Sequence, residues 1–151
     1  MTYNVECQVK YLVILLLAGV LVACRPADVA QGSAQVTLEI FSGRETPVWS
    51  LSRADTRRLA ELLANLAQGN QPVPPGKLGY RGFAVKLPDA GGATCHTLWV
   101  FKSFLECEAG SGSTLLSDPD RQVEQLLVAS ARDHLPSDLY ATLRKQTEAS
   151  P

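Results

Sequence analysis

An uncharged apolar segment near the N-terminus limits which part of this chain can belong to a folded, water-facing domain. Residues 11–23 read YLVILLLAGVLVA, thirteen residues without a charged side chain, and Cys24 follows directly. A helix that crosses a bilayer needs about 20 apolar residues, so this segment is too short to span one comfortably. Its length is typical of the apolar core of a secretory signal peptide, with Lys10 as the basic residue before it. We therefore expect the folded domain to lie after this segment.

The end of the apolar segment carries a specific motif. The four residues Leu21-Val22-Ala23-Cys24 place a small residue directly before a cysteine, and they resemble the lipobox of bacterial lipoproteins. In that class the cysteine thiol receives a diacylglyceryl group, and signal peptidase II cuts just before it. The resemblance implies that residues 1–23 are a signal peptide and that Cys24 carries acyl chains such as palmitate. The alternative is an ordinary signal peptide or a short membrane anchor with a chance cysteine.

The lipobox also implies where the protein lies. A single acyl chain binds a membrane only marginally, at about 0.8 kcal/mol per buried methylene, so two or three chains are needed for lasting attachment. Residues 24–35 show no periodicity, which predicts a lipidated cysteine followed by a tether. Arg25 stands where many envelope systems read an aspartate as a retention signal. The resemblance therefore implies an extracytoplasmic, lipid-anchored protein of the cell envelope, in the outer membrane if the host has one.

The composition of the chain fits one small globular domain. Apolar residues make up 46% of the 151 residues and charged residues 19%, which excludes a low-complexity or wholly disordered chain. The net charge is −1, so the chain lacks the basic excess of a nucleic-acid-binding protein, and we expect no nucleic-acid partner. We predict a single domain over residues 36–146 and a flexible C-terminal tail over residues 147–151.

The cysteines predict one disulfide. Removal of the signal peptide would take away Cys7, and lipid would occupy Cys24, which leaves Cys95 and Cys107. An even pair of cysteines in an oxidising compartment favours a disulfide. The alternative is a metal site, which lacks the usual paired ligand spacing and would draw on Cys95, His96, Cys107 and His134. We favour the disulfide and predict no metal site.

Alternation of apolar and polar residues predicts the strands. Val36, Leu38 and Ile40 recur at every second position, which is typical of a half-buried strand. Residues 47–51 predict a short strand at a sheet edge, because Pro47 cannot donate a backbone hydrogen bond. The same two-residue period predicts further strands over residues 83–87, 97–101 and 104–108.

Capping residues and apolar spacing predict the helices. Ser52 and Asp55 form a capping box ahead of an apolar stripe, and Gly69 is expected to end that helix. Asp118, followed by a proline, predicts the N-cap of a second helix, which Pro136 ends before a third. The apolar stripe of the first helix comprises Leu59, Leu62, Leu63 and Leu66.

The order of these elements predicts an α+β fold, with an antiparallel sheet of about four strands and two to three helices packed on one face. Residues 110–113 are expected to form a flexible loop. A tight turn at Lys102-Ser103 would place Cys95 about 10 Å from Cys107, too far for a disulfide. Three solutions satisfy the disulfide: a turn nearer Phe101, a bulge, or a Cys95 that has left the ladder. The last two are favoured, because phenylalanine is a poor turn residue.

Known catalytic motifs are missing from the sequence. It contains no nucleophile elbow, phosphate-binding loop, zinc-protease helix, EF-hand loop or dinucleotide fingerprint, so we predict no catalytic residue and no cofactor. His96 and His134 are expected to be structural or solvent-facing. Glu106 and Glu108 lie about 7 Å apart on one strand face, a spacing that glycoside hydrolysis could use, but a solvated face is the simpler interpretation. Three arginines of the first helix could bind an anion or form a solvated face: Arg53, Arg57 and Arg58.

Aromatic residues on the polar side of the predicted strands indicate a function. Phe41, Trp99 and Phe101 fall among charged and hydroxyl side chains, a pattern typical of interaction surfaces. Alternatively, Trp49 and the proline-rich loop cover them as a second small core. The sequence thus predicts a non-catalytic binding module with a protein partner in the envelope. The alternative is a small-ligand or metal binder, or more remotely a hydrolase, in a cleft near His96, His134 and residues 70–79.

Overall fold

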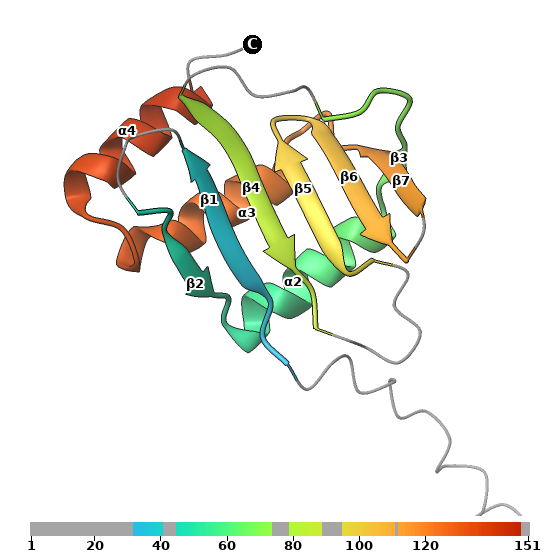
Figure 1. Cartoon of the computed structure of the whole chain (residues 1–151), viewed down its shortest axis with the longest axis horizontal. Helices are drawn as coiled ribbons and strands as arrows, with labels where there is room; N and C mark the ends of the chain where they lie inside the picture. Colours follow the sequence, from blue (N-terminus) through green and yellow to red (C-terminus); the bar gives the residue numbers. More distant parts are fainter. Residues whose placement is uncertain (1–31, 41–44, 74–78, 89–94, 111, 149–151) are drawn as a thin grey trace, which may run out of the picture.

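The computed structural model describes residues 32–40, 45–73, 79–88, 95–110 and 112–148 (Figure 1). Cys24 and Phe41 lie outside the described residues, so the predicted lipid site and one predicted surface aromatic are not placed. Within these ranges, no helix has the length and apolar character that crossing a membrane requires.

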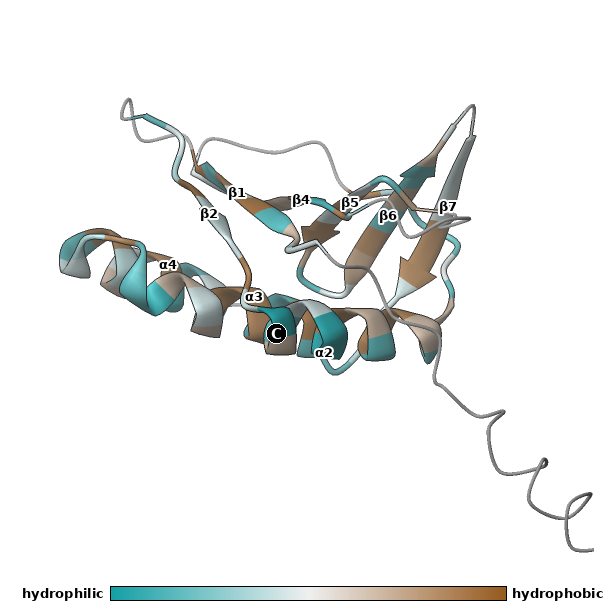
Figure 2. Cartoon of the chain, turned by 90° about the horizontal axis from the view of Figure 1, so that it is seen from below, coloured by the Kyte–Doolittle hydropathy of each residue, from teal (hydrophilic) through white to brown (hydrophobic). Residues whose placement is uncertain are grey.

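The described chain forms two layers, an antiparallel sheet and a layer of helices on one of its faces (Figures 1 and 2). The sheet has seven strands in the order β2-β1-β4-β5-β6-β7-β3. They are β1 (Gln35–Ile40), β2 (Val48–Ser50), β3 (Ala67–Gln68), β4 (Tyr80–Lys86), β5 (Thr97–Phe101), β6 (Phe104–Ala109) and β7 (Gly112–Ser117). The helices are α2 (Arg53–Ala64), α3 (Gln122–Ser130), the short 3-10 helix η2 (Ala131–Asp133) and α4 (Ser137–Glu148). The predicted α+β class with an antiparallel sheet is confirmed.

The predicted number of strands, about four, is wrong. The sheet has seven strands because β7 occupies part of the Gly-Ser segment expected to be a loop, and β3 adds two residues at the far edge. Gly110 has a φ of +54°, a left-handed conformation that glycine adopts without strain, directly after β6. The ladder then resumes with Ala109 opposite Gly112. Backbone pairing with β6, rather than a local apolar pattern, makes this segment a strand.

Helix α2 begins as predicted and ends earlier than predicted. Ser52 is its N-cap: the Ser52 Oγ accepts from the Asp55 N–H at 3.0 Å and donates to the Asp55 carboxylate at 2.7 Å. The helix ends at Ala64, not near Gly69. The Gly69 N–H instead donates to the Leu115 carbonyl at 2.8 Å, since the chain leaves the helix to pair with β7. A Cβ at Gly69 would lie 2.9 Å from the Leu116 backbone, so this close approach requires glycine.

Helix α3 begins at Gln122, three residues after the start that the predicted N-cap Asp118 would give. Its N-cap is Arg121, with a φ of 55°, and not Asp118. The Asp118 N–H donates to the Ser103 carbonyl at 3.0 Å, which holds this residue at the end of β7. The buried Asp118 carboxylate still satisfies the helix start, because it accepts from the Val123 N–H at 2.8 Å. The aspartate therefore supplies the capping hydrogen bond from outside the helix.

The hydrophobic core lies between the sheet and the helices. Burying such side chains contributes about 1.5–3 kcal/mol each. The sheet supplies Val36, Leu38, Phe83, Val85, Leu98, Val100 and Leu105, and the helices supply Leu59, Val123, Leu127 and Leu143. All of these are almost completely buried, and the helices cover this face of the sheet only (Figure 2).

The predicted disulfide between Cys95 and Cys107 is present, with the two Cα atoms 5.4 Å apart. The β5–β6 hairpin turns at Lys102-Ser103, because Phe101 pairs with Phe104. Cys95 lies before β5, which begins at Thr97, and bonds to Cys107 from outside the ladder. Of the three solutions that the sequence left open, the structure adopts the one in which Cys95 has left the ladder.

Reduction of this disulfide is expected to lower the free energy of unfolding by about 3 kcal/mol, because the unfolded chain then regains the entropy of a loop of this length. Urea unfolding of the oxidised protein and of the reduced, alkylated protein would measure the difference. The Cys95→Ser/Cys107→Ser variant is the control and should not respond to reductant. A loss below about 1 kcal/mol would contradict the expectation.

The two outermost strands of the sheet are its shortest. Strand β2 has three residues and β3 has two. The edge position predicted from Pro47 is confirmed: β2 pairs with β1 and is the first strand in the sheet order. Val48 of this strand is the exposed large apolar residue of the described chain, at 52%.

Candidate binding surface

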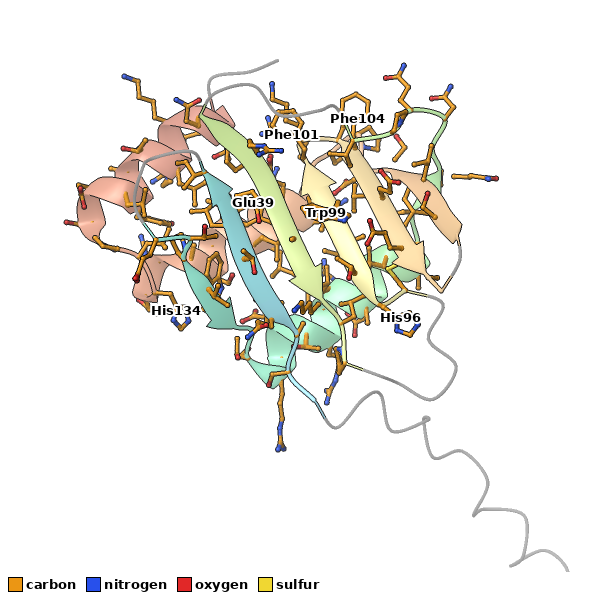
Figure 3. All side chains as sticks on the ribbon, viewed as in Figure 1. Glu39, His96, Trp99, Phe101, Phe104 and His134 are labelled. Atoms are coloured by element: carbon orange, nitrogen blue, oxygen red, sulfur yellow. A yellow bond between two sulfur atoms is a disulfide. The ribbon has the colours of Figure 1, made fainter. Side chains whose placement is uncertain are left out.

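The outer face of the sheet, opposite the helices, carries Trp99 and Phe101, two of the three predicted surface aromatics. The register of the ladders defines a row across this face that runs Val48, Thr37, Ala84, Trp99, Glu106 and Leu115. Thr37 and Ala84 have small side chains, so the Trp99 indole has no large side chain beside it in this row on the β4 side. Figure 3 shows Trp99 near the middle of the sheet, on the side turned toward the reader and away from the helices.

Three aromatic residues, which we call the outer-face cluster, gather on β5 and β6: Trp99, Phe101 and Phe104. Phe101 and Phe104 are direct partners across the hairpin. Each of the three is half-buried although no described helix covers this face, and Phe101 also packs against the hydrophobic core. The Trp99 Nε1–H donates to the Glu108 Oε1 at 3.0 Å, which fixes the indole over β6. The structure therefore brings two of the predicted aromatics together and adds Phe104.

Phe104 was not predicted as part of the surface, although the sequence carried a signal for it. A two-residue turn at Lys102-Ser103 pairs the residues on either side of it, and these are two phenylalanines. Alternation along β6 then places Phe104 on the same face as Glu106 and Glu108. Combining the turn position with the strand period would have found this residue.

Carboxylates surround the outer-face cluster. Glu106 and Glu108 lie on the same face of β6, and Glu39 lies on β1 opposite Gly82 (Figure 3). Lys86 of β4 lies on the same face in register with Thr97, and the Lys102 ammonium lies over the Phe101 ring. The Glu108 carboxylate is engaged by the Trp99 indole, so the arrangement is an aromatic patch with acidic neighbours rather than a pair of carboxylates facing a cleft.

Trp49 does not cover this surface. It is 5% exposed and lies on the helix side of the sheet, where its ring meets Phe83 edge-on at 6.3 Å and stacks on His134 at 6.0 Å. Its Nε1–H donates to the Ser130 hydroxyl at 3.1 Å. The alternative in which Trp49 folds over the surface aromatics is therefore wrong.

Below one end of the outer-face cluster lies a buried carboxylate, Glu124 of α3, which is 1% exposed. It accepts hydrogen bonds from the Tyr80 hydroxyl at 2.6 Å, from the Lys102 N–H at 3.0 Å and from the Arg121 Nε–H at 2.9 Å. A second Arg121 nitrogen also donates to Glu124 and to the Thr147 carbonyl. Lys102 and Arg121 are the two non-glycine residues with positive φ among the described residues, so one carboxylate stabilises both strained positions.

Tyr80 connects this carboxylate to the surface aromatics. Its ring lies 5.8 Å from that of Phe101, whose face is also approached by the Lys102 ammonium at 5.4 Å. Burial, followed by the neighbouring Glu124 charge, raises the pKa of Tyr80 well above its usual range. The hydroxyl therefore stays protonated and remains a donor to Glu124 at neutral pH.

The proposed metal and cleft residues are not assembled. Cys95 and Cys107 form the disulfide, and Figure 3 places His96 at the start of β5 and His134 on the far side beside β2. In the sheet, β1 and β4 lie between β2, beside His134, and β5, beside His96. Across the described ranges, no group of three or more histidine, cysteine or acidic residues could hold a metal ion. A hollow of about 450 Å³ lies between α3 and α4, but its arginines, Arg121 and Arg144, are paired with Glu124 and Glu148.

The residues that carry the site are therefore Trp99, Phe101 and Phe104 with their acidic neighbours, and the histidines lie elsewhere. Phe41 falls outside the described residues and stays a prediction. Comparison of the chain with protein-family models finds no matching family, and comparisons with curated proteins and with solved structures find no match.

Proposed function

We propose that this protein is a lipid-anchored, extracytoplasmic protein of the cell envelope that acts by binding a protein partner rather than by catalysis. The observation that carries the proposal is the outer-face cluster, Trp99, Phe101 and Phe104, on the sheet face that the helices leave uncovered. Buried aromatic anchors dominate the energy of protein interfaces, and tryptophan is among the most frequent of them. The lipobox at Cys24 supports the anchor, and Arg25 favours the outer membrane if the host has one.

The charges around the cluster define the partner that fits it. Glu106 and Glu108 give the β6 side of Trp99 a local excess of negative charge, whereas Lys86 and Lys102 lie toward Thr97 and Phe101. A complementary surface would present an apolar side chain to Trp99 and lysine or arginine side chains to the carboxylates. The partner that we propose is therefore an envelope protein with a basic surface around an apolar residue.

Site-specific crosslinking in intact cells would test this proposal. A photoreactive residue at Thr97, in the strand beside Trp99, is expected to capture one dominant protein, whereas the same residue at the exposed Gln125 of α3 should not. Purified partner would then be titrated against the wild-type domain and against Trp99→Ala. We expect Trp99→Ala to weaken binding by a factor of about 30 or more, since loss of an interface hot spot costs at least about 2 kcal/mol.

Tyr140→Ala on α4 is the matched control, because it truncates another half-buried aromatic in the helix layer. It should leave the affinity unchanged. Equal binding by wild-type protein and by a folded Trp99→Ala variant would contradict the assignment of this surface. Capture of cell-wall glycan at Thr97, in place of protein, would contradict the proposed class of partner.

A further inference from the structure

The exposed side of α2 carries a cluster of arginines that the proposed binding surface does not use. Arg53, Arg57 and Arg58 are all exposed. Arg58 pairs loosely with Glu61 at 3.6 Å, whereas Arg53 and Arg57 form no ion pair with any described residue. The other acid of the helix, Asp55, is engaged by the Ser52 hydroxyl and lies toward the covered side. The solvent side of α2 therefore has an excess of positive charge, which we call the basic face.

The neighbouring helix adds no negative charge beside this face. Helix α3 packs next to α2 and exposes Gln122, Gln125 and Ala129. Its one acidic residue, Glu124, is buried and paired with Arg121. The opposite side of the molecule is the outer face, which carries Glu39, Glu106 and Glu108. The exposed side of α2 and the β6 side of the outer face thus differ in the sign of their charge.

The chain enters the fold at the first turn of α2. The Ala34 N–H donates to the Thr56 Oγ1 at 3.2 Å, and the Ala34 carbonyl accepts from the Leu51 N–H at 2.8 Å. Thr56 directly precedes Arg57 in the helix. Figure 1 shows the start of β1 and the start of α2 at the same end of the molecule. An anchor attached to the chain before Ala34 would therefore also keep the basic face close to it.

The tether is short enough to bring this face to a membrane. Ala34 lies ten positions after Cys24, a stretch that spans at most about 35 Å when fully extended and about 16–19 Å as a random coil. A lipid on Cys24 would keep α2 near the surface long enough to sample contact. Within the Debye length of about 8 Å, arginines are then attracted to anionic headgroups.

We propose that the basic face of α2 docks on the anionic phospholipid surface to which Cys24 is anchored, and that this docking turns the outer face away from the membrane. This inference rests on the lipid anchor of the proposed function. The anchor makes the contact intramolecular, so a few arginines suffice to orient a domain that they could not recruit alone.

The test uses the chain from Cys24 onward, which contains every described strand and helix. Coupling Cys24 to a maleimide lipid in nanodiscs makes the result independent of whether cells acylate this residue. Headgroups that carry gadolinium then broaden the NMR signals of nearby residues. In discs rich in phosphatidylglycerol, we expect α2 signals to broaden at least about five-fold more than β5 signals, the preference that about one arginine provides.

Two comparisons decide between docking and a net-charge effect. The Arg53→Gln/Arg57→Gln/Arg58→Gln variant, phosphatidylcholine discs and 0.5 M salt should each remove the difference between α2 and β5. The Arg81→Gln/Lys86→Gln/Lys145→Gln variant, which loses the same charge from exposed residues elsewhere, should keep it. Equal broadening of both elements in anionic discs, or the same loss in both variants, would overturn the proposal. Metabolic labelling of Cys24 with a palmitate analogue tests the anchor separately, so the two failures are distinguishable.

Discussion

Replacement of Glu124 by alanine is expected to lower the free energy of unfolding by about 3–5 kcal/mol, the usual cost of removing one partner from a buried ion pair. The carboxylate is 1% exposed and receives donors from three separate elements. Its loss would leave the Tyr80 hydroxyl and the Lys102 N–H without an acceptor in a place that water does not reach. It would also take away the carboxylate to which the Arg121 guanidinium donates two hydrogen bonds.

Chemical unfolding monitored by the fluorescence of the two tryptophans would measure this loss. Glu61→Ala is the control, because it removes an acid from an exposed i,i+3 pair with Arg58, and such pairs contribute at most about 1 kcal/mol. If both variants lost the same small amount, the buried network would not stabilise the fold. A Glu124→Gln variant should fall between them, because the amide keeps one acceptor oxygen but no charge.

Gly82→Ala is expected to be the second large loss, of about 3–5 kcal/mol. Gly82 has a φ of +104° and lies where the register of β1 and β4 shifts. A Cβ built on it would lie 2.1 Å from the Val100 carbonyl oxygen and 3.2 Å from the Phe101 Cβ. Backbone strain costs about 1–3 kcal/mol and overpacking a similar amount. The neighbouring strand β5 would have to move, and with it the outer-face cluster.

Gly79→Ala isolates the two contributions. Gly79 has an almost equal φ of +110°, but a Cβ there would meet no atom within 4 Å. The variant should therefore lose only the strain, about 1–3 kcal/mol, and unfolding in urea would give the difference. If both variants lost the same free energy of unfolding, the close contact between Val100 and residue 82 would not contribute to the cost of Gly82→Ala.

Local signals in the sequence predicted the elements that are defined locally. The Ser52 and Asp55 capping box and the two-residue period of β1 and β5 each specify one element without reference to the rest of the chain. The disulfide followed from the even pair of cysteines left after the expected processing, and the position of Cys95 outside the ladder was one of the solutions that the turn at Lys102-Ser103 left open. For the candidate site, the same period placed Trp99 and Phe101 on one face.

Features that depend on distant pairing could not be predicted in this way. Strand β7 has few apolar residues and forms because β6 offers it a ladder. Helix α3 starts at Gln122, after its N-cap Arg121, because Asp118 is held by Ser103, fifteen residues earlier in the chain. The contact of Tyr80 with Glu124 joins residues 44 positions apart, and no pattern in either segment marks a buried carboxylate. Long-range polar contacts of this kind carry no periodic signal.

The short outer strands have a consequence for aggregation. A sheet recruits a foreign strand through the unpaired backbone groups of its edges, and long flat edges nucleate fibrils. At the β2 edge the outermost strand has only three residues, so an incoming chain finds little ladder to extend there. At the other edge, β3 pairs with Leu116 and Ser117 alone, two of the six residues of β7. The β2 edge should therefore resist pairing between copies of this domain, even where confinement to a surface raises their local concentration.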